Sequence, residues 1–306
     1  MALATDGISS QVRHTRRAAL RLGAMSVAAL LLGCRPHLEM VAPDSDSQSA
    51  VHVPPEDATA PAEPAQPTVA AFPKGTVERM LLPGTPWATR LRVVHSGVPG
   101  PVVLVLGGVH GDEPGAWAAA DQVATWMPTS GSLLVIPRAN VVAIAQNVRT
   151  TTELGDLNRL YPGDPKSKSP MSRMAAAIVS AVREFKVQVV YDMHESWDFY
   201  AERSQNGNAF LGQTVSGGTG EDALLNARAL VVRANQRITV KRDRMVARSE
   251  VPAASVKQTN SLGIGRFVDD LTCLLIEMGQ DHQQESRRTE LHVLVARTFL
   301  ESRSML

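Results

Sequence analysis

The chain has 306 residues, 44% of them hydrophobic, which is enough for one large domain or two small ones. Its formal net charge is +1, but the first 33 residues hold four arginines and one acid, which leaves −2 for the remainder. A near-neutral body lacks the basic face that nucleic-acid binding needs, and aromatic residues, at 4%, are too sparse for base-stacking platforms.

The N-terminus has the pattern of an export signal. Arg16 and Arg17 precede a run of apolar and small residues that is too short to span a membrane but typical of a signal peptide. The run ends in Leu31-Leu32-Gly33-Cys34, which resembles a bacterial lipobox, in which cleavage exposes a cysteine that receives lipid. Residues 15–21 resemble a twin-arginine export motif with Ala19 in place of the usual phenylalanine; an ordinary secretory signal is the alternative. We expect a signal peptide over residues 1–33 and a lipid anchor at Cys34, hence an exported, membrane-anchored lipoprotein of the bacterial cell envelope or periplasm.

Residues 34–73 have the composition of a spacer. They contain eight prolines among Ala, Ser, Asp and Glu, and such a segment buries too little apolar surface to offset its ordering entropy. We therefore expect a disordered linker over residues 34–73 and a catalytic domain over residues 74–306. The second cysteine, Cys273, lies in an apolar stretch and is expected to be a buried thiol without a disulfide.

Strand-like and helix-like segments alternate along the domain. Strands are expected at residues 90–94, 101–106, 133–136, 187–191 and 271–276, and helices at residues 116–126, 171–185, 221–236 and 283–300. This alternation predicts one α/β domain with a largely parallel central sheet flanked by helices.

Candidate metal ligands and acids follow three of the expected strands. His110 and Glu113 follow the strand at 101–106, His194 follows that at 187–191, and Glu277 follows that at 271–276. Because ligands bind at the carboxyl ends of parallel strands, we expect these side chains on one rim of the sheet. Two histidines and a glutamate, with a fourth position left for water, form a common catalytic zinc site. A His-x-x-Glu pair alone also occurs as a rim salt bridge, so the zinc interpretation rests on the combination.

Further motifs occur over residues 102–279. They are GGVHGDEPG, Pro137-Arg138-Ala139-Asn140, an arginine before Asp156-Leu157-Asn158-Arg159 with Pro162-Gly163, the Asp-Met-His that ends at His194, and Ile-Glu-Met-Gly around Glu277. With these motifs the chain resembles the zinc carboxypeptidase superfamily, most closely its succinylglutamate desuccinylase/aspartoacylase branch. The resemblance implies a zinc-carboxypeptidase-like three-layer sandwich with a mixed, largely parallel central sheet.

The resemblance also implies a metal centre. His110, Glu113 and His194 would hold one Zn²⁺ per chain, and Asp156 would orient a ligating imidazole from behind.

Four residues are implied in catalysis and binding. Glu277 would be the general base and then the proton donor to the leaving amine, and Arg149 would polarise the scissile carbonyl. Asn158 and Arg159 would grip a substrate carboxylate, although a structural salt bridge is the alternative for Arg159.

Two features depart from the pattern of the superfamily, the lack of a late tyrosine and the acidic and aromatic run after His194, and the role of Arg266 is open. Peptidases of the superfamily use a tyrosine shortly before the catalytic glutamate, and here no tyrosine follows Tyr200. Glu195, directly after His194, has three possible roles: it contacts the substrate, supports a neighbouring group of the site, or is a solvated residue of the rim. Arg266 has two possible roles: it contacts the substrate, or it is an ordinary surface residue.

The expected activity is zinc-dependent hydrolysis of an amide bond adjacent to a free carboxylate. Export favours peptides as substrates, hence a metallocarboxypeptidase that is bound to the membrane through its lipid. The alternatives are an N-acyl amino acid deacylase and a non-catalytic lipoprotein that binds peptides.

Overall fold

The computed structural model describes residues 72–202, 211–220, 222–248 and 259–306. The predicted signal peptide, Cys34 and residues 35–71 of the predicted linker lie outside these ranges. Within them, no helix combines the length and the hydropathy needed to cross a bilayer.

One eight-stranded sheet forms the centre of the domain, with strand order β1-β2-β4-β3-β5-β8-β6-β7. The strands are β1 (Lys74–Leu81), β2 (Thr89–Ser96), β3 (Val102–Leu106), β4 (Ser132–Ile136), β5 (Val189–Ser196), β6 (Thr214–Gly217), β7 (Val246–Arg248) and β8 (Thr272–Gly279). The four central strands, β4, β3, β5 and β8, run parallel, whereas β1, β2 and β6 join the sheet through antiparallel pairings. The predicted mixed, largely parallel sheet is therefore confirmed.

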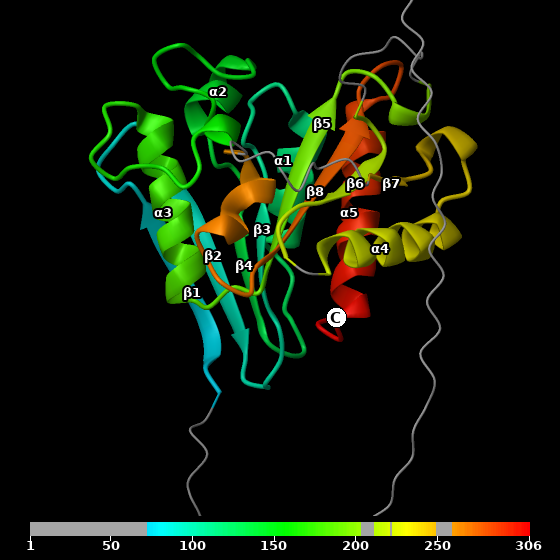
Figure 1. Cartoon of the computed structure of the whole chain (residues 1–306), viewed down its shortest axis with the longest axis horizontal. Coiled ribbons are helices and arrows are strands. Elements are labelled where there is room, and N and C mark those ends of the chain that lie inside the picture. The colour runs from blue at the N-terminus through cyan, green and yellow to red at the C-terminus, as the bar shows by residue number, and fades with distance from the viewer. Residues whose placement is uncertain (1–71, 203–210, 221, 249–258) are drawn as a thin grey trace, which may run out of the picture. The chain divides into compact units, whose positions relative to one another are not determined.

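Helices cover both faces of this sheet, as Figure 1 shows. They are α1 (Pro114–Val123), α2 (Val141–Gln146), α3 (Pro170–Glu184), α4 (Ala223–Arg237) and α5 (Glu285–Ser302). Residues of α1, α4 and α5 share one buried apolar cluster with one face of the sheet, and α3 shares a second cluster with the opposite face. The central strands are thus buried on both faces, which explains the continuous apolar run of β3. The predicted three-layer α/β sandwich is confirmed.

Two strand boundaries were wrong in a way that matters for the site. The sequence pattern ended two central strands at residues 191 and 276, but β5 continues to Ser196 and β8 to Gly279. The charged and imidazole side chains in these extensions are buried, so their polarity does not mark the end of the strand. His194 and Glu277 therefore lie within strands, and they are direct register partners across the β5–β8 pair.

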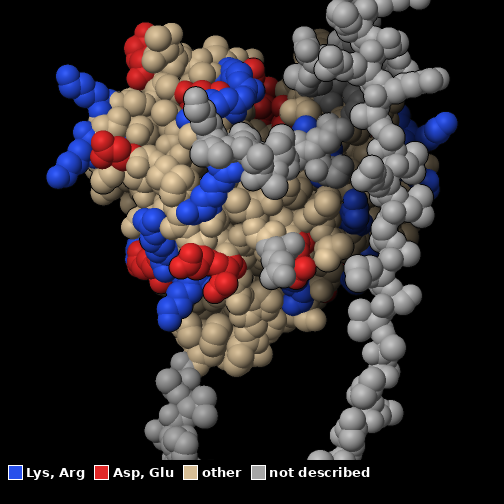
Figure 2. Space-filling model, viewed as in Figure 1, with Lys and Arg blue, Asp and Glu red and all other residues tan. Residues whose placement is uncertain are grey.

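Charged side chains of both signs are interspersed on the face of the described residues that Figure 2 shows. Several form exposed ion pairs, among them Arg79 with Glu184 and Arg242 with Glu202. Exposed pairs of this kind contribute little to stability, about 0–1 kcal/mol each. The two buried apolar clusters therefore supply most of the stability of the fold.

Candidate metal centre and active site

The loop between β3 and α1 is held tightly against α2 by its glycines. A Cβ atom on Gly111 would lie 2.1 Å from the backbone carbonyl of Ala143, so only glycine fits this position. The Gly111 amide also donates to the carbonyl oxygens of Val148 and Arg149, which fixes the loop to the segment that follows α2. Glu113 ends the loop as the residue directly before α1. The loop is therefore a rigid support for His110 and Glu113.

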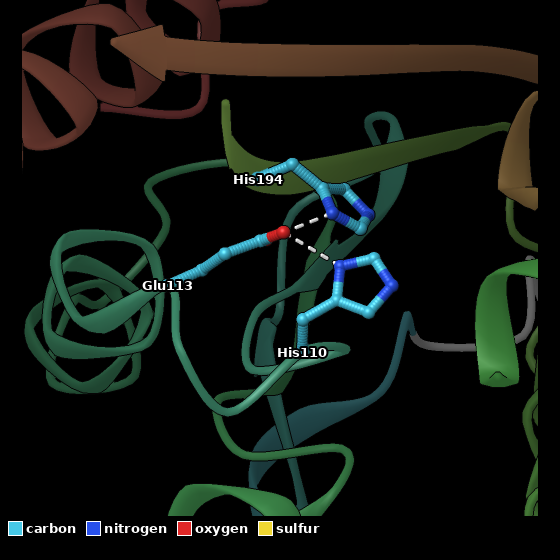
Figure 3. Close-up of side chains that lie close together, drawn as sticks. All are labelled: His110, Glu113 and His194. Carbon is cyan, nitrogen blue, oxygen red and sulfur yellow. Dashed lines mark hydrogen bonds and ion pairs between the residues drawn. The ribbon is translucent and has the colours of Figure 1, made fainter. Parts of the chain in front are cut away.

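The three predicted metal ligands converge, as Figure 3 shows. Nδ1 of His110 lies 2.6 Å from Oε1 of Glu113, and Nδ1 of His194 lies 2.9 Å from Oε2 of the same carboxylate. One ligand atom from each residue lies within 4.8 Å of the other two, and all three side chains are buried. The loop after β3 and the end of β5 thus bring together residues that are 81 positions apart.

Each histidine is held from behind by a carboxylate. Nε2 of His110 lies 3.1 Å from Oδ1 of Asp156, as predicted for Asp156, and Nε2 of His194 lies 2.9 Å from Oδ2 of Asp192. Sequence reasoning missed Asp192, because it treated residue 192 as part of a rim. These contacts turn both Nδ1 atoms toward Glu113, and a carboxylate behind a ligating imidazole is the usual arrangement in zinc proteins. The donor set therefore fits a zinc ion.

The same contacts shift the pKa values of the cluster. Burial would lower the pKa of His194, but Asp192 and Glu113 outweigh it and hold that pKa well above its usual value. Burial would raise the pKa of Glu113, but the two histidines hold it well below its usual range. Asp156, which faces His110, has its pKa lowered to about 2 despite partial burial. Against the lowering effect of burial, Glu113 and Asp156 likewise raise the pKa of His110, so metal binding competes with protonation of both imidazoles.

Glu277 lies beside this cluster and forms no ion pair within 4.0 Å among the described residues. It is the register neighbour of His194 on β8, its side chain is buried, and its Oε2 has no hydrogen-bond partner in the same part of the chain. Burial raises the pKa of Glu277 to about 7. A carboxyl group with this pKa can accept and return a proton near neutral pH, which is what a general base requires.

The predicted cationic groups reach the same site from the segment that follows α2. Arg149 lies 3.4 Å from Oε1 of Glu113 and 3.6 Å from Oδ2 of Asp156. Asn158 accepts a hydrogen bond from the Ser261 amide through Oδ1, so its NH₂ group is left to donate. Arg159 is exposed, and NH1 donates to the Asn158 carbonyl at 2.7 Å.

All the predicted catalytic, metal-binding and substrate-binding residues except Asp156 line one cavity of about 560 Å³. Arg266 does not line it and is exposed. None of the three tyrosines lines it either, so the departure seen in the sequence holds in the structure. The lining also includes residues to which the sequence analysis assigned no role: Asp112, Ser196, Leu211, Ser216, Arg248, Asn260, Leu262, Leu275 and Gln280.

Glu195 has a structural place that the sequence left open. Its Oε1 accepts from Nε of Arg288 at 2.9 Å, and its Oε2 accepts from Nε2 of Gln280 at 3.0 Å. Gln280 also donates to the carbonyl of Asp112, at 2.8 Å, in the loop between His110 and Glu113. Both oxygens of Glu195 are thus engaged in a buried network that connects β5, α5 and the metal-ligand loop.

Residues 99–198 match the family model of the succinylglutamate desuccinylase/aspartoacylase catalytic domain. This range holds the three converging ligands and Asp156, Asn158 and Arg159. Comparison with curated protein sequences finds no match.

Solved structures share the fold at low sequence identity. Tripeptide-bound Cell Shape Determinant Csd4 from Helicobacter pylori is similar with a TM-score of 0.59 and 17% identity, covering 71% of this chain and 56% of that chain. The mDAP-bound form of the same protein, described as a D,L-carboxypeptidase, has a TM-score of 0.58 and 18% identity, covering 68% of this chain and 52% of that chain. The chain thus spans slightly more than half the length of Csd4.

A second kind of neighbour comes from the branch named by the family model. A succinylglutamate desuccinylase/aspartoacylase from Rhodobacter sphaeroides has a TM-score of 0.54 and 20% identity, covering 76% of this chain and 67% of that chain. The predicted resemblance to the succinylglutamate desuccinylase/aspartoacylase branch is therefore confirmed over residues 99–198, and the solved structures share the fold.

Proposed function

We propose that the chain is a zinc-dependent hydrolase that cleaves an amide bond adjacent to a free carboxylate, and that it acts on peptides as an exported carboxypeptidase. One observation carries the proposal. A buried carboxyl group, Glu277, lies beside a converged His-Glu-His set and faces the same cavity as Arg149 and Arg159. A protein that only binds peptides has no need of a general base in this position.

His110, Glu113 and His194 would hold the zinc ion. Zinc in such a site supplies a Lewis acid that activates water and polarises a carbonyl group.

The residues around this position divide the remaining work. Glu277 accepts a proton from the attacking water and returns it to the leaving amine, since its raised pKa suits both steps. Arg149, beside Glu113, donates to the oxygen on which negative charge develops. Arg159 and the NH₂ group of Asn158 bind the free carboxylate, which holds the scissile bond at the metal centre.

Peptides are the favoured substrate class for two reasons. Csd4 is described as a D,L-carboxypeptidase in one of its structures, and a second Csd4 structure contains a bound tripeptide. The N-terminal pattern that ends at Cys34 supports export as a lipoprotein, and an enzyme outside the cytoplasm meets peptides rather than cytosolic N-acyl amino acids. The family match over residues 99–198 favours the alternative, an N-acyl amino acid deacylase.

The test is hydrolysis by the purified chain, stripped of metal and reloaded with one equivalent of zinc. We expect release of the last residue from short peptides with a free carboxyl terminus, and weaker release from N-acetyl and N-succinyl amino acids. The matched variant is Glu277→Gln, which keeps size and hydrogen bonding but cannot accept the proton. Absence of turnover on both substrate classes, or turnover that Glu277→Gln leaves intact, contradicts the proposal.

A further inference from the structure

Trp197 stands apart from the other tryptophans of the chain. Trp87, Trp117 and Trp126 are partly buried and each lies beneath an arginine side chain, with the guanidinium carbon 4.3–4.8 Å from the ring centroid. Trp197 is 67% exposed, has no such partner among the described residues, and lines the cavity that holds the metal centre. Its indole therefore contributes little to the fold and is presented to whatever enters the cavity.

The backbone of Trp197 is nevertheless held firmly. Its carbonyl accepts from the amides of Gln280, at 3.1 Å, and Asp281, at 2.8 Å, both just beyond the end of β8. The next residue, Asp198, accepts from the Gly212 amide at 2.8 Å. Leu211 lies on the same rim, with its amide 3.2 Å from Oγ of Ser196, and it also lines the cavity. An exposed aromatic ring on a fixed backbone is preorganised for binding, because little conformational freedom is lost when a ligand covers it.

The distance from the metal centre to Trp197 determines how long a ligand must be to contact the indole. Trp197 follows His194 by three residues at the end of β5, which is about 10 Å at about 3.3 Å per residue. An extended peptide advances at nearly the same rate, so a substrate that runs from the metal centre along β5 would meet the ring with its second or third residue beyond the scissile bond. An acetyl or succinyl group, with bonds of about 1.5 Å, extends about 5 Å at most.

We infer that Trp197 is a binding subsite for the acyl side of an extended peptide, which covers the indole two to three residues from the scissile bond. This inference rests on the proposed function, and it narrows the substrate to peptides of at least about three to four residues. The N-acyl amino acid class is too short to reach the subsite.

Hydrolysis of matched substrates tests the inference. The substrates are tetra-alanine and N-acetylalanine, which release the same residue, assayed with the zinc-loaded full chain. Wild type should prefer tetra-alanine in kcat/KM, and Trp197→Ala should lower that preference about tenfold, mainly through KM, as expected for loss of partial coverage of an indole. Trp197→Phe should restore most of the preference. Trp126→Phe, which changes a tryptophan outside the cavity, should keep the wild-type ratio.

A binding measurement separates this inference from the proposed activity. Tryptophan fluorescence of the Glu277→Gln chain should shift when tetra-alanine is added, and the additional change Trp197→Phe should remove the shift. If no substrate is hydrolysed but this Trp197-dependent shift occurs, the proposed activity is wrong and the peptide subsite stands. A tetra-alanine preference equal in wild type and Trp197→Ala, or a fluorescence shift that persists without Trp197, overturns the subsite.

Discussion

Replacing Asp192 with asparagine tests whether the carboxylates behind the histidines prepare the site for metal. Asp192 is fully buried, and its Oδ2 lies 2.9 Å from Nε2 of His194. Asparagine keeps the shape but removes the charge, and a hydrogen bond to a charged group contributes about 1.5–3 kcal/mol. We therefore expect Asp192→Asn to weaken zinc binding by about 10- to 100-fold.

Asp156→Asn provides a graded comparison at the other histidine. Its contact with His110 is longer, 3.1 Å, and its side chain is 22% exposed, so solvent screens the charge and the loss should be smaller, about three- to tenfold. Zinc affinity is measured by competition with a chelating dye, and circular dichroism confirms that both variants are folded. Affinity of Asp192→Asn within twofold of wild type, or a larger loss for Asp156→Asn, would refute the reasoning.

Four further changes test other parts of the site. Glu277→Gln should lower kcat by at least about 100-fold, while zinc stoichiometry stays at one. In the wild-type enzyme, kcat/KM should fall as the pH drops through the pKa of Glu277, because the base is then protonated. Burial raises this pKa to about 7 and a bound cation would lower it, so the acid limb of the pH–rate profile should lie at or below pH 7. Arg159→Met should raise KM about 10- to 100-fold with a smaller change in kcat, and Arg159→Lys should recover part of the loss in steady-state kinetics. Gly111→Ala should lower the free energy of unfolding by about 2–4 kcal/mol in a denaturant titration, because its Cβ would meet backbone of α2 at 2.1 Å. Arg288→Met should cost about 3–5 kcal/mol in the same titration because it leaves Glu195 buried and unpaired, and the double change with Glu195→Gln should recover most of that loss.

The fold was predictable because its strongest signals are local. The apolar runs of β3, β4 and the first halves of β5 and β8 identify buried central strands, and α3 and α5 are long periodic helices. Three outer strands were missed. The strands β6 and β7 have only four and three residues, and the edge strand β1 is almost entirely exposed, so none of them shows the sequence pattern of a buried strand.

The candidate site was only partly predictable, for a different reason. His110, Glu113 and His194 were found because their residue types and spacing are typical of zinc sites. Asp192 could have been found too, since residues two apart on a strand face the same side, but only if β5 had been extended past Tyr191. Arg248 could not have been found, because it reaches the cavity through the β6–β7 pairing, which joins segments that show no signal in the sequence.

The environments of the carboxyl groups explain why Glu277 suits proton transfer better than Glu113, Asp156 or Glu195. Glu113 and Asp156 face imidazoles, which hold their pKa values low, so both stay ionised at neutral pH. Burial raises the pKa of Glu195 to about 7 against the opposing effects of Gln280 and Arg288, but both of its oxygens are already bonded to those two residues and cannot serve a substrate. Glu277 combines a raised pKa with an oxygen, Oε2, that has no hydrogen-bond partner among the described residues, and its side chain lines the cavity. The distinction among these four carboxyl groups therefore follows from which of them have partners, a property that the sequence alone does not contain.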